Sequence, residues 1–106
     1  MNYNNFKNYY LQKVLDFLIF SIKENGKSYI ISVKKIRDFH KIKSENKSFI
    51  NFIWRCLIKL SERDFIKNYD ENNHSRKYII SNKFRVYFKK YKEEEMRINI
   101  YNSLYS

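Results

Sequence analysis

Four polar side chains recur at helical spacing between residues 44 and 63, inside a segment that is otherwise strongly apolar. They are Ser48, Asn51, Arg55 and Lys59, separated by three, four and four residues. At 100° per residue, this spacing places all four on one face of a helix. Arginine and lysine can bind guanine O6 and N7, asparagine can bind adenine N6 and N7, and serine can bind a base or a phosphate. The spacing therefore predicts a helix face suited to reading base edges in the major groove of DNA.

The rest of the circumference of this helix is apolar and predicts burial. Lys47 and Glu62 extend the polar face to about a third of the circumference, and the apolar residues take nearly all of the remainder. We expect Trp54 to lie in the core. Cys56 falls opposite the polar face, and we interpret it as a small buried residue rather than a nucleophile.

The chain is basic, and its positive charge is unevenly distributed. Its 106 residues include 22 Lys and Arg against 11 Asp and Glu, a net charge of +11. Nine of these basic residues, but only two acidic ones, lie between positions 27 and 59. Such a cluster indicates a polyanionic partner, which means nucleic acid first and an anionic membrane surface second. A biased genome would also enrich lysine, but it would not concentrate positive charge in one segment.

Residue types that support catalysis, metal binding or membrane insertion are sparse. One cysteine, two histidines and one glycine allow no intrachain disulfide, no metal-ligand motif and no glycine-rich phosphate loop. The apolar runs are too short to cross a bilayer, and no segment reads as a signal peptide. We therefore expect a protein that is not an enzyme and needs no cofactor or metal. We also expect no membrane partner and a cytoplasmic, nucleoid-associated location.

The sequence predicts both helices and strands around the helix that carries the polar face. Helical periodicity, turn formers and β-branched runs predict a helix, a short edge strand, two further helices and a β-hairpin around a polar loop. Ser32 and Ser44 are expected to cap the second and third helices. The approximate ranges of these elements are 6–24, 28–32, 33–41, 45–62, 65–69 and 77–81.

The C-terminal segment, residues 82–106, allows two interpretations. Its charged helix formers and lack of a turn signal favour one helix capped by Ser81 or Asn82. The acidic run 93–95 would then pair with the lysines that precede it. The alternation of apolar residues in 83–88 would instead fit a further strand.

This order of elements resembles the winged helix-turn-helix family, especially its small archaeal and viral DNA-binding proteins. The expected fold class is α+β and mainly helical, with a winged helix-turn-helix over residues 1–81 and a C-terminal helical extension over 82–106. The resemblance implies that residues 45–62 form a recognition helix in the major groove. It also implies that a wing over residues 65–81 contacts the adjacent backbone or minor groove, so that the chain would be a transcriptional regulator that binds double-stranded DNA.

The predicted DNA-binding residues come from the second helix, its connector, the recognition helix and the wing. Surplus aromatic surface on the first helix and near the C-terminus further predicts a homodimer through these segments. The alternative is a winged-helix protein-interaction module, an accessory subunit of a replication or transcription complex. An RNA-binding or membrane-surface protein is a third interpretation. The predicted DNA-binding set is Lys34, Lys35, Arg37, Lys43, Lys47, Ser48, Asn51, Arg55, Lys59, His74, Arg76 and Lys77.

Overall fold

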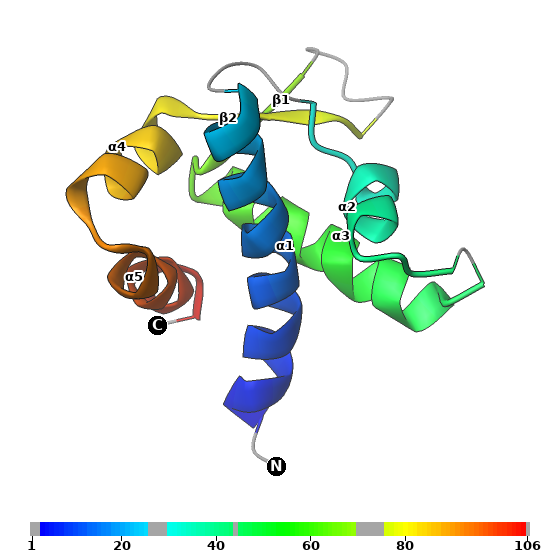
Figure 1. Ribbon diagram of the computed structural model, residues 1–106. Coiled ribbons are helices and arrows are strands. Elements are labelled where there is room, and N and C mark those ends of the chain that lie inside the picture. The colour runs from blue at the N-terminus through cyan, green and yellow to red at the C-terminus, as the bar shows by residue number, and fades with distance from the viewer. Residues whose placement is uncertain (1–2, 26–29, 44, 70–75, 106) are drawn as a thin grey trace.

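A computed structural model of the chain describes residues 3–25, 30–43, 45–69 and 76–105. Within these ranges it is α+β and mainly helical, as predicted, with five helices and one two-stranded antiparallel sheet (Figure 1). No helix of the described residues has the length and apolar character needed to cross a membrane. The elements are α1 (Tyr3–Asn25), α2 (Val33–Phe39), α3 (Lys47–Glu62), β1 (Ile66–Asn68), β2 (Tyr78–Ile80), α4 (Asn82–Lys90) and α5 (Glu93–Tyr105).

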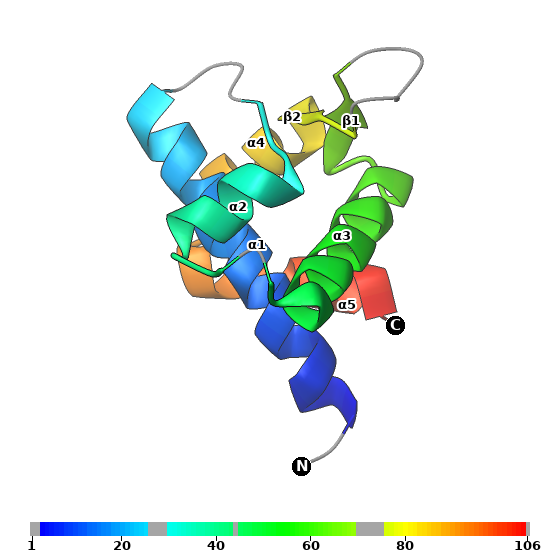
Figure 2. The ribbon, with the colours of Figure 1, turned by 90° about the vertical axis from the view of Figure 1, so that its right-hand side faces the viewer.

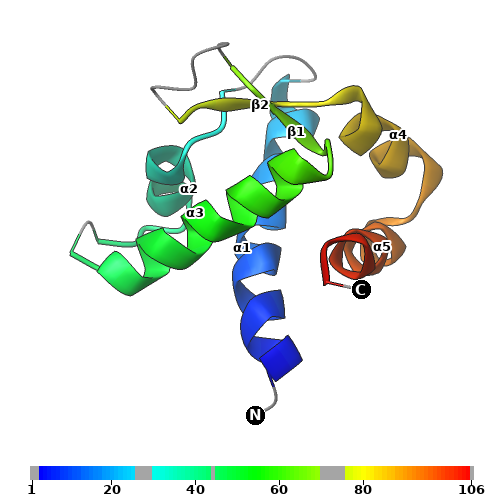
Figure 3. The same ribbon diagram turned by 180° about the vertical axis from the view of Figure 1, so that it is seen from behind.

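The long helix α1 forms the middle of the molecule. Its residues Leu11, Leu15 and Leu18 are fully buried, because α1 contacts α2 and α3 as well as α5. Figure 2 shows α2 and α3 close together, with the hairpin beyond the C-terminal end of α3. Seen from behind, α3 crosses α1 as an outermost element (Figure 3). One face of α3 therefore belongs to the core and the opposite face is open.

The turn between α2 and α3 has no glycine, and a lysine takes the conformation that glycine usually adopts. Lys41 has φ 58°, in the left-handed region. The Ile42 N–H donates to the Arg37 carbonyl and the Lys41 N–H to the Asp38 carbonyl. This is the hydrogen-bond pattern of a Schellman C-cap, which ends α2 and redirects the chain toward α3.

The two strands form the predicted hairpin, and a third segment joins it. β1 pairs antiparallel with β2 in the register Ile66 to Ile80, and the Tyr69 N–H extends this pairing to the Lys77 carbonyl at 2.7 Å. On the other edge of β2, Ile31 forms an antiparallel bridge with Tyr78, with hydrogen bonds of 2.7 and 2.8 Å. The predicted edge strand is thus reduced, within the described residues, to one bridge.

The structure confirms the predicted cap of α2, selects Ser81 over Asn82 as the cap of α4 and contradicts the predicted cap of α3. Ser32 accepts from the Lys35 N–H at the start of α2, and Ser81 accepts from the Phe84 N–H at the start of α4. The prediction of a Ser44 cap for α3 was wrong, because α3 begins later and the Asn46 side chain accepts from the Phe49 N–H. Ser44 itself lies outside the described residues.

The C-terminal segment is helical, so the strand interpretation is excluded, but it forms two helices rather than one. The chain is extended at Tyr91, which ends α4, and α5 begins at Glu93. The acidic run therefore lies in the first turn of α5, where a negative charge complements the helix dipole. Glu93 pairs with Arg97 and with Lys23 of α1, each at 3.5 Å, and not with the preceding lysines.

The homodimer prediction rested on eight aromatic residues and one leucine of the first helix and the C-terminal segment, and most of them pack within the chain. Only Tyr9 and Phe20 of these nine are exposed, at 53% and 36%. α5 is also tied to α1, because Arg97 donates to Asp16 at 2.8 Å and to Gln12 at 2.6 Å. The other seven are buried or partly buried against the core: Tyr10, Phe17, Tyr87, Tyr91, Tyr101, Leu104 and Tyr105.

Candidate nucleic-acid interface

The polar residues of α3 form a continuous exposed face. Ser48, Asn51, Arg55 and Lys59 are all exposed, and so are Lys47 and Glu62 at the two ends. The opposite face is buried, with Ile53, Leu57 and Leu60 at 0% exposure. Arg55 lies over the ring of Phe52, and Lys59 lies over the ring of Tyr105 on α5. The helical spacing in the sequence thus identified which side of α3 faces outward.

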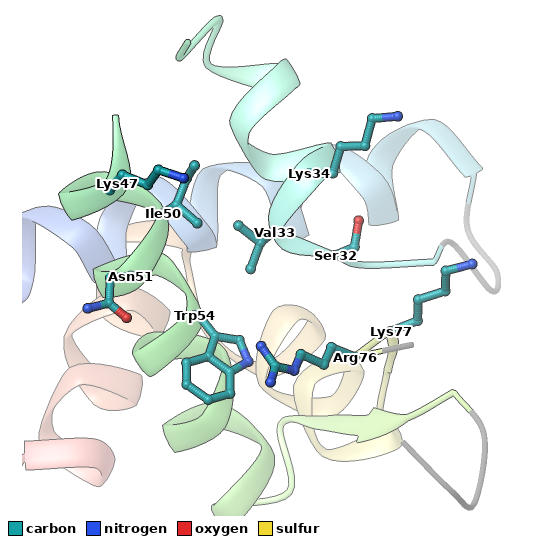
Figure 4. A pocket seen from close by; sticks show the side chains of 9 residues that line it. All are labelled: Ser32, Val33, Lys34, Lys47, Ile50, Asn51, Trp54, Arg76 and Lys77. Atoms are coloured by element: carbon teal, nitrogen blue, oxygen red, sulfur yellow. The ribbon is translucent and has the colours of Figure 1, made fainter. Parts of the chain in front are cut away.

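An open pocket of about 590 Å³ lies beside this face, between α3, the start of α2 and the chain leading into β2. Figure 4 shows that its side chains come from all three segments. Four of them are cationic, and none of the described lining residues is acidic. The lining residues are Ser32, Val33, Lys34, Lys47, Ile50, Asn51, Trp54, Arg76 and Lys77.

Trp54 borders this pocket and is only half-buried, so the prediction that it lies in the core was wrong. It borders the polar face of α3 on the side toward α2, where the core no longer covers it. The Arg76 guanidinium lies over the indole ring, 4.6 Å from its centroid. The indole Nε1–H is shielded from water and has no hydrogen-bond acceptor among the described residues.

The pocket brings together five of the twelve predicted binding residues: Lys34, Lys47, Asn51, Arg76 and Lys77. Lys35 and Lys43 are exposed nearby, on α2 and in the connector. The Arg37 side chain is only 21% exposed and lies 3.6 Å from the Asp38 carboxylate, so its charge is partly neutralised. His74 lies outside the described residues.

Sequence reasoning missed the apolar wall of the pocket, which consists of Val33, Ile50 and Trp54. All three were counted as core residues or left unassigned. Ile50 and Trp54 are one helical turn apart on the flank of the polar face, next to Lys47 and Asn51. The position of Trp54 next to the polar face could have predicted its partial exposure. An aromatic residue at the border of a polar face is only partly covered unless another element packs over it.

Other kinds of chemistry have little support in the described part of the chain. No three His, Cys, Asp or Glu side chains gather there into a group that could hold a metal ion. Cys56 is buried, as predicted. Burial raises the pKa of its thiol from the ordinary value of 9.0 to about 11, although a hydrogen bond with Tyr105 opposes this shift. A thiol with so high a pKa carries almost no thiolate at neutral pH.

Comparisons of the chain with protein-family models, with curated proteins and with solved structures gave no match. The assignment of a function therefore depends on the exposed face of α3 and on the pocket beside it.

Proposed function

We propose that the protein is a double-stranded DNA-binding regulator of transcription, with α3 as the helix that enters the major groove. The observation that carries the proposal is the exposed face of α3. Its four central residues, Ser48, Asn51, Arg55 and Lys59, are hydrogen-bonding or cationic, and none has a role in the core. A helix held on the outside of a domain with this set of side chains has the geometry and the chemistry for base contacts.

The arrangement of the neighbouring elements supports a winged helix-turn-helix. α2 and α3 are joined by a tight turn at Lys41, and a hairpin follows α3 directly. β2 lies between β1 and Ile31. This order is expected if β1 and β2 form the wing and the segment at Ile31 supports it. The hairpin leads back to Arg76 and Lys77 beside α3, where a wing would contact the DNA backbone.

The two central side chains of the α3 face provide the test of this proposal. A cognate site would first be selected from random DNA, and binding would then be measured by gel shift or fluorescence anisotropy. Asn51→Ala and Arg55→Ala should each lose about 1–3 kcal/mol of binding free energy on the cognate site. On random DNA, Asn51→Ala should lose almost nothing, because a neutral amide adds little to counterion release.

A matched control is available on α5, where Asn102 is also exposed on a helix. Asn102→Ala should leave both affinities unchanged. Circular dichroism should show that all three variants stay folded, since none of these side chains fills the core. Equal losses on cognate and random DNA for Asn51→Ala, or no loss at all, would contradict base reading by α3.

The homodimer remains a prediction, and the surface left for it is small. Tyr9 and Phe20 on α1 are the exposed members of the aromatic set that suggested it. Light scattering coupled to size exclusion would decide between monomer and dimer. If a dimer forms, Phe20→Ser should shift it toward the monomer, whereas a monomeric wild type would contradict the prediction.

An aromatic patch favours a second function, the protein-interaction module. Phe20 of α1 and Phe39 of α2 are 36% and 37% exposed, and their ring centroids are 5.0 Å apart. A larger protein could dock there, while the basic face of α3 makes only non-specific contacts with DNA. Failure to select a cognate sequence, together with weak binding to all DNA, would favour this function over the first.

A further inference from the structure

Trp54 and Arg76 form a pair whose hydrogen-bonding capacity is unused among the described residues. The Arg76 guanidinium lies over the indole face at 4.6 Å, and the side chain has no hydrogen bond or ion pair with a described residue. Figure 4 shows the nitrogen-bearing edge of the indole turned toward this guanidinium. Both groups are hydrogen-bond donors only, so neither can accept a hydrogen bond from the other.

The remainder of the pocket has a mixed character that narrows the class of ligand. One wall is apolar and aromatic, whereas Lys34, Lys47 and Lys77 supply positive charge around the rim. Asn51 adds an amide that can pair with the edge of a base. A volume of about 590 Å³ falls in the usual range for pockets that hold a small molecule. An aromatic wall with a cationic rim fits a nucleobase attached to a phosphate.

We propose that this pocket takes one unpaired nucleotide of a nucleic-acid strand, with its base stacked on Trp54 and its phosphate bound by Arg76 and the rim lysines. This deepens the proposed function, on which it rests, because it adds recognition of a single-stranded end or gap to the duplex contact of α3. Arg76 is exposed and at the edge of the pocket, so its guanidinium leaves the indole when a phosphate binds it. The base then occupies the place that the guanidinium vacates, since both are planar groups that stack on aromatic rings.

The test uses the intrinsic fluorescence of the full chain, since Trp54 is its only tryptophan. Four probes are titrated: a blunt duplex, the same duplex with a single-stranded overhang, a deoxynucleoside monophosphate and inorganic phosphate. The overhang duplex should quench the Trp54 emission strongly, because stacking of a base brings it into contact with the indole. The blunt duplex and inorganic phosphate can draw Arg76 away from the indole but bring no unpaired base onto it, so they should change the emission much less than the overhang duplex does.

Substitution of Trp54 separates stacking from a structural role. With a labelled overhang duplex, Trp54→Phe should keep the affinity within about threefold, and Trp54→Leu should weaken it by about tenfold or more, the loss expected for one base–aromatic stack. Neither variant should change the affinity for the blunt duplex. If Trp54→Leu does not fold, the fluorescence titration of the wild type still decides the question.

The outcomes distinguish this inference from the proposed function. Equal quenching by blunt and overhang duplexes, or equal losses for Trp54→Leu on both, would overturn the inference. Saturation by the monophosphate at the same concentration as the overhang duplex would assign the pocket to a free nucleotide and overturn the assignment to a strand. If duplex binding depends on Asn51 and Arg55 while the overhang adds no quenching, the inference fails and the proposed function stands.

Discussion

Replacing Phe65 with alanine should lower the free energy of unfolding by about 3–5 kcal/mol, the usual cost of removing a buried phenyl ring. Phe65 is fully buried at the point where α3 ends and the hairpin begins. Its ring contacts Tyr87 of α4 edge-on, with centroids 5.1 Å apart. It therefore joins α3, the hairpin and α4, and the Lys83 ammonium also lies over its ring, 4.4 Å from the centroid. A small domain has only about 5–15 kcal/mol of total stability, so this loss is large.

Urea denaturation followed by circular dichroism measures this loss. Tyr69→Ala is the matched control, because Tyr69 is an aromatic residue just after β1 that is 54% exposed. The control should change the free energy of unfolding by less than about 1 kcal/mol. A loss for Phe65→Ala no greater than that of the control would mean that the hairpin is not packed on the core as described.

The buried and exposed faces of α3 could be predicted from the sequence, because the repeat of an α-helix alone determines which of its side chains share a face. Ile53, Leu57 and Leu60 recur every three to four residues and are all buried, while Asn51 and Arg55 fall between them and are exposed. The order of elements could be predicted for a similar reason. Caps such as Ser32 and Ser81 act within one turn of the residue that they bond, so their signal is local.

The turn between α2 and α3 could not be predicted from neighbouring residues in the sequence. The left-handed conformation of Lys41 is disfavoured for a residue with a side chain, and no glycine in the sequence marks it. It is accepted because two hydrogen bonds close the end of α2 and because Ile36 of α2 is buried in the core. Packing between helices therefore sets this conformation, and a sequence taken alone does not reveal such packing.

The break between α4 and α5 could have been found from charge. Lys89 and Lys90 lie in the last turn of α4, and Glu93 opens the first turn of α5. Basic residues complement the dipole at the C-terminus of a helix, and acidic residues complement it at the N-terminus. Lysines followed by glutamates therefore indicate that one helix ends and another begins. The pocket could not be found in this way, because it depends on how close Arg76 comes to Trp54 across a gap of 22 positions in the sequence.

Removing three lysines from the pocket rim should reduce the affinity for any duplex DNA by a large factor. Lys34, Lys47 and Lys77 are exposed and approach one pocket from α2, α3 and the start of β2. If each neutralises one phosphate, the triple alanine variant loses about 2.7 from the slope of log affinity against log salt. Near 0.1 M salt, that corresponds to a loss on the order of 10²–10³-fold. The slope would be measured by anisotropy at several salt concentrations.

The control removes the same amount of charge from a different part of the molecule. Lys89, Lys90 and Lys92 are exposed where α4 leads into α5, across α1 from α2 (Figure 1). Their triple alanine variant has the same net charge as the first, so a slope that depends only on total charge would fall equally in both. We expect the control to change the slope by less than about 1, because these lysines lie away from the α3 face. Equal losses would mean that DNA is attracted to the basic protein as a whole, and α3 would then have no special part in binding.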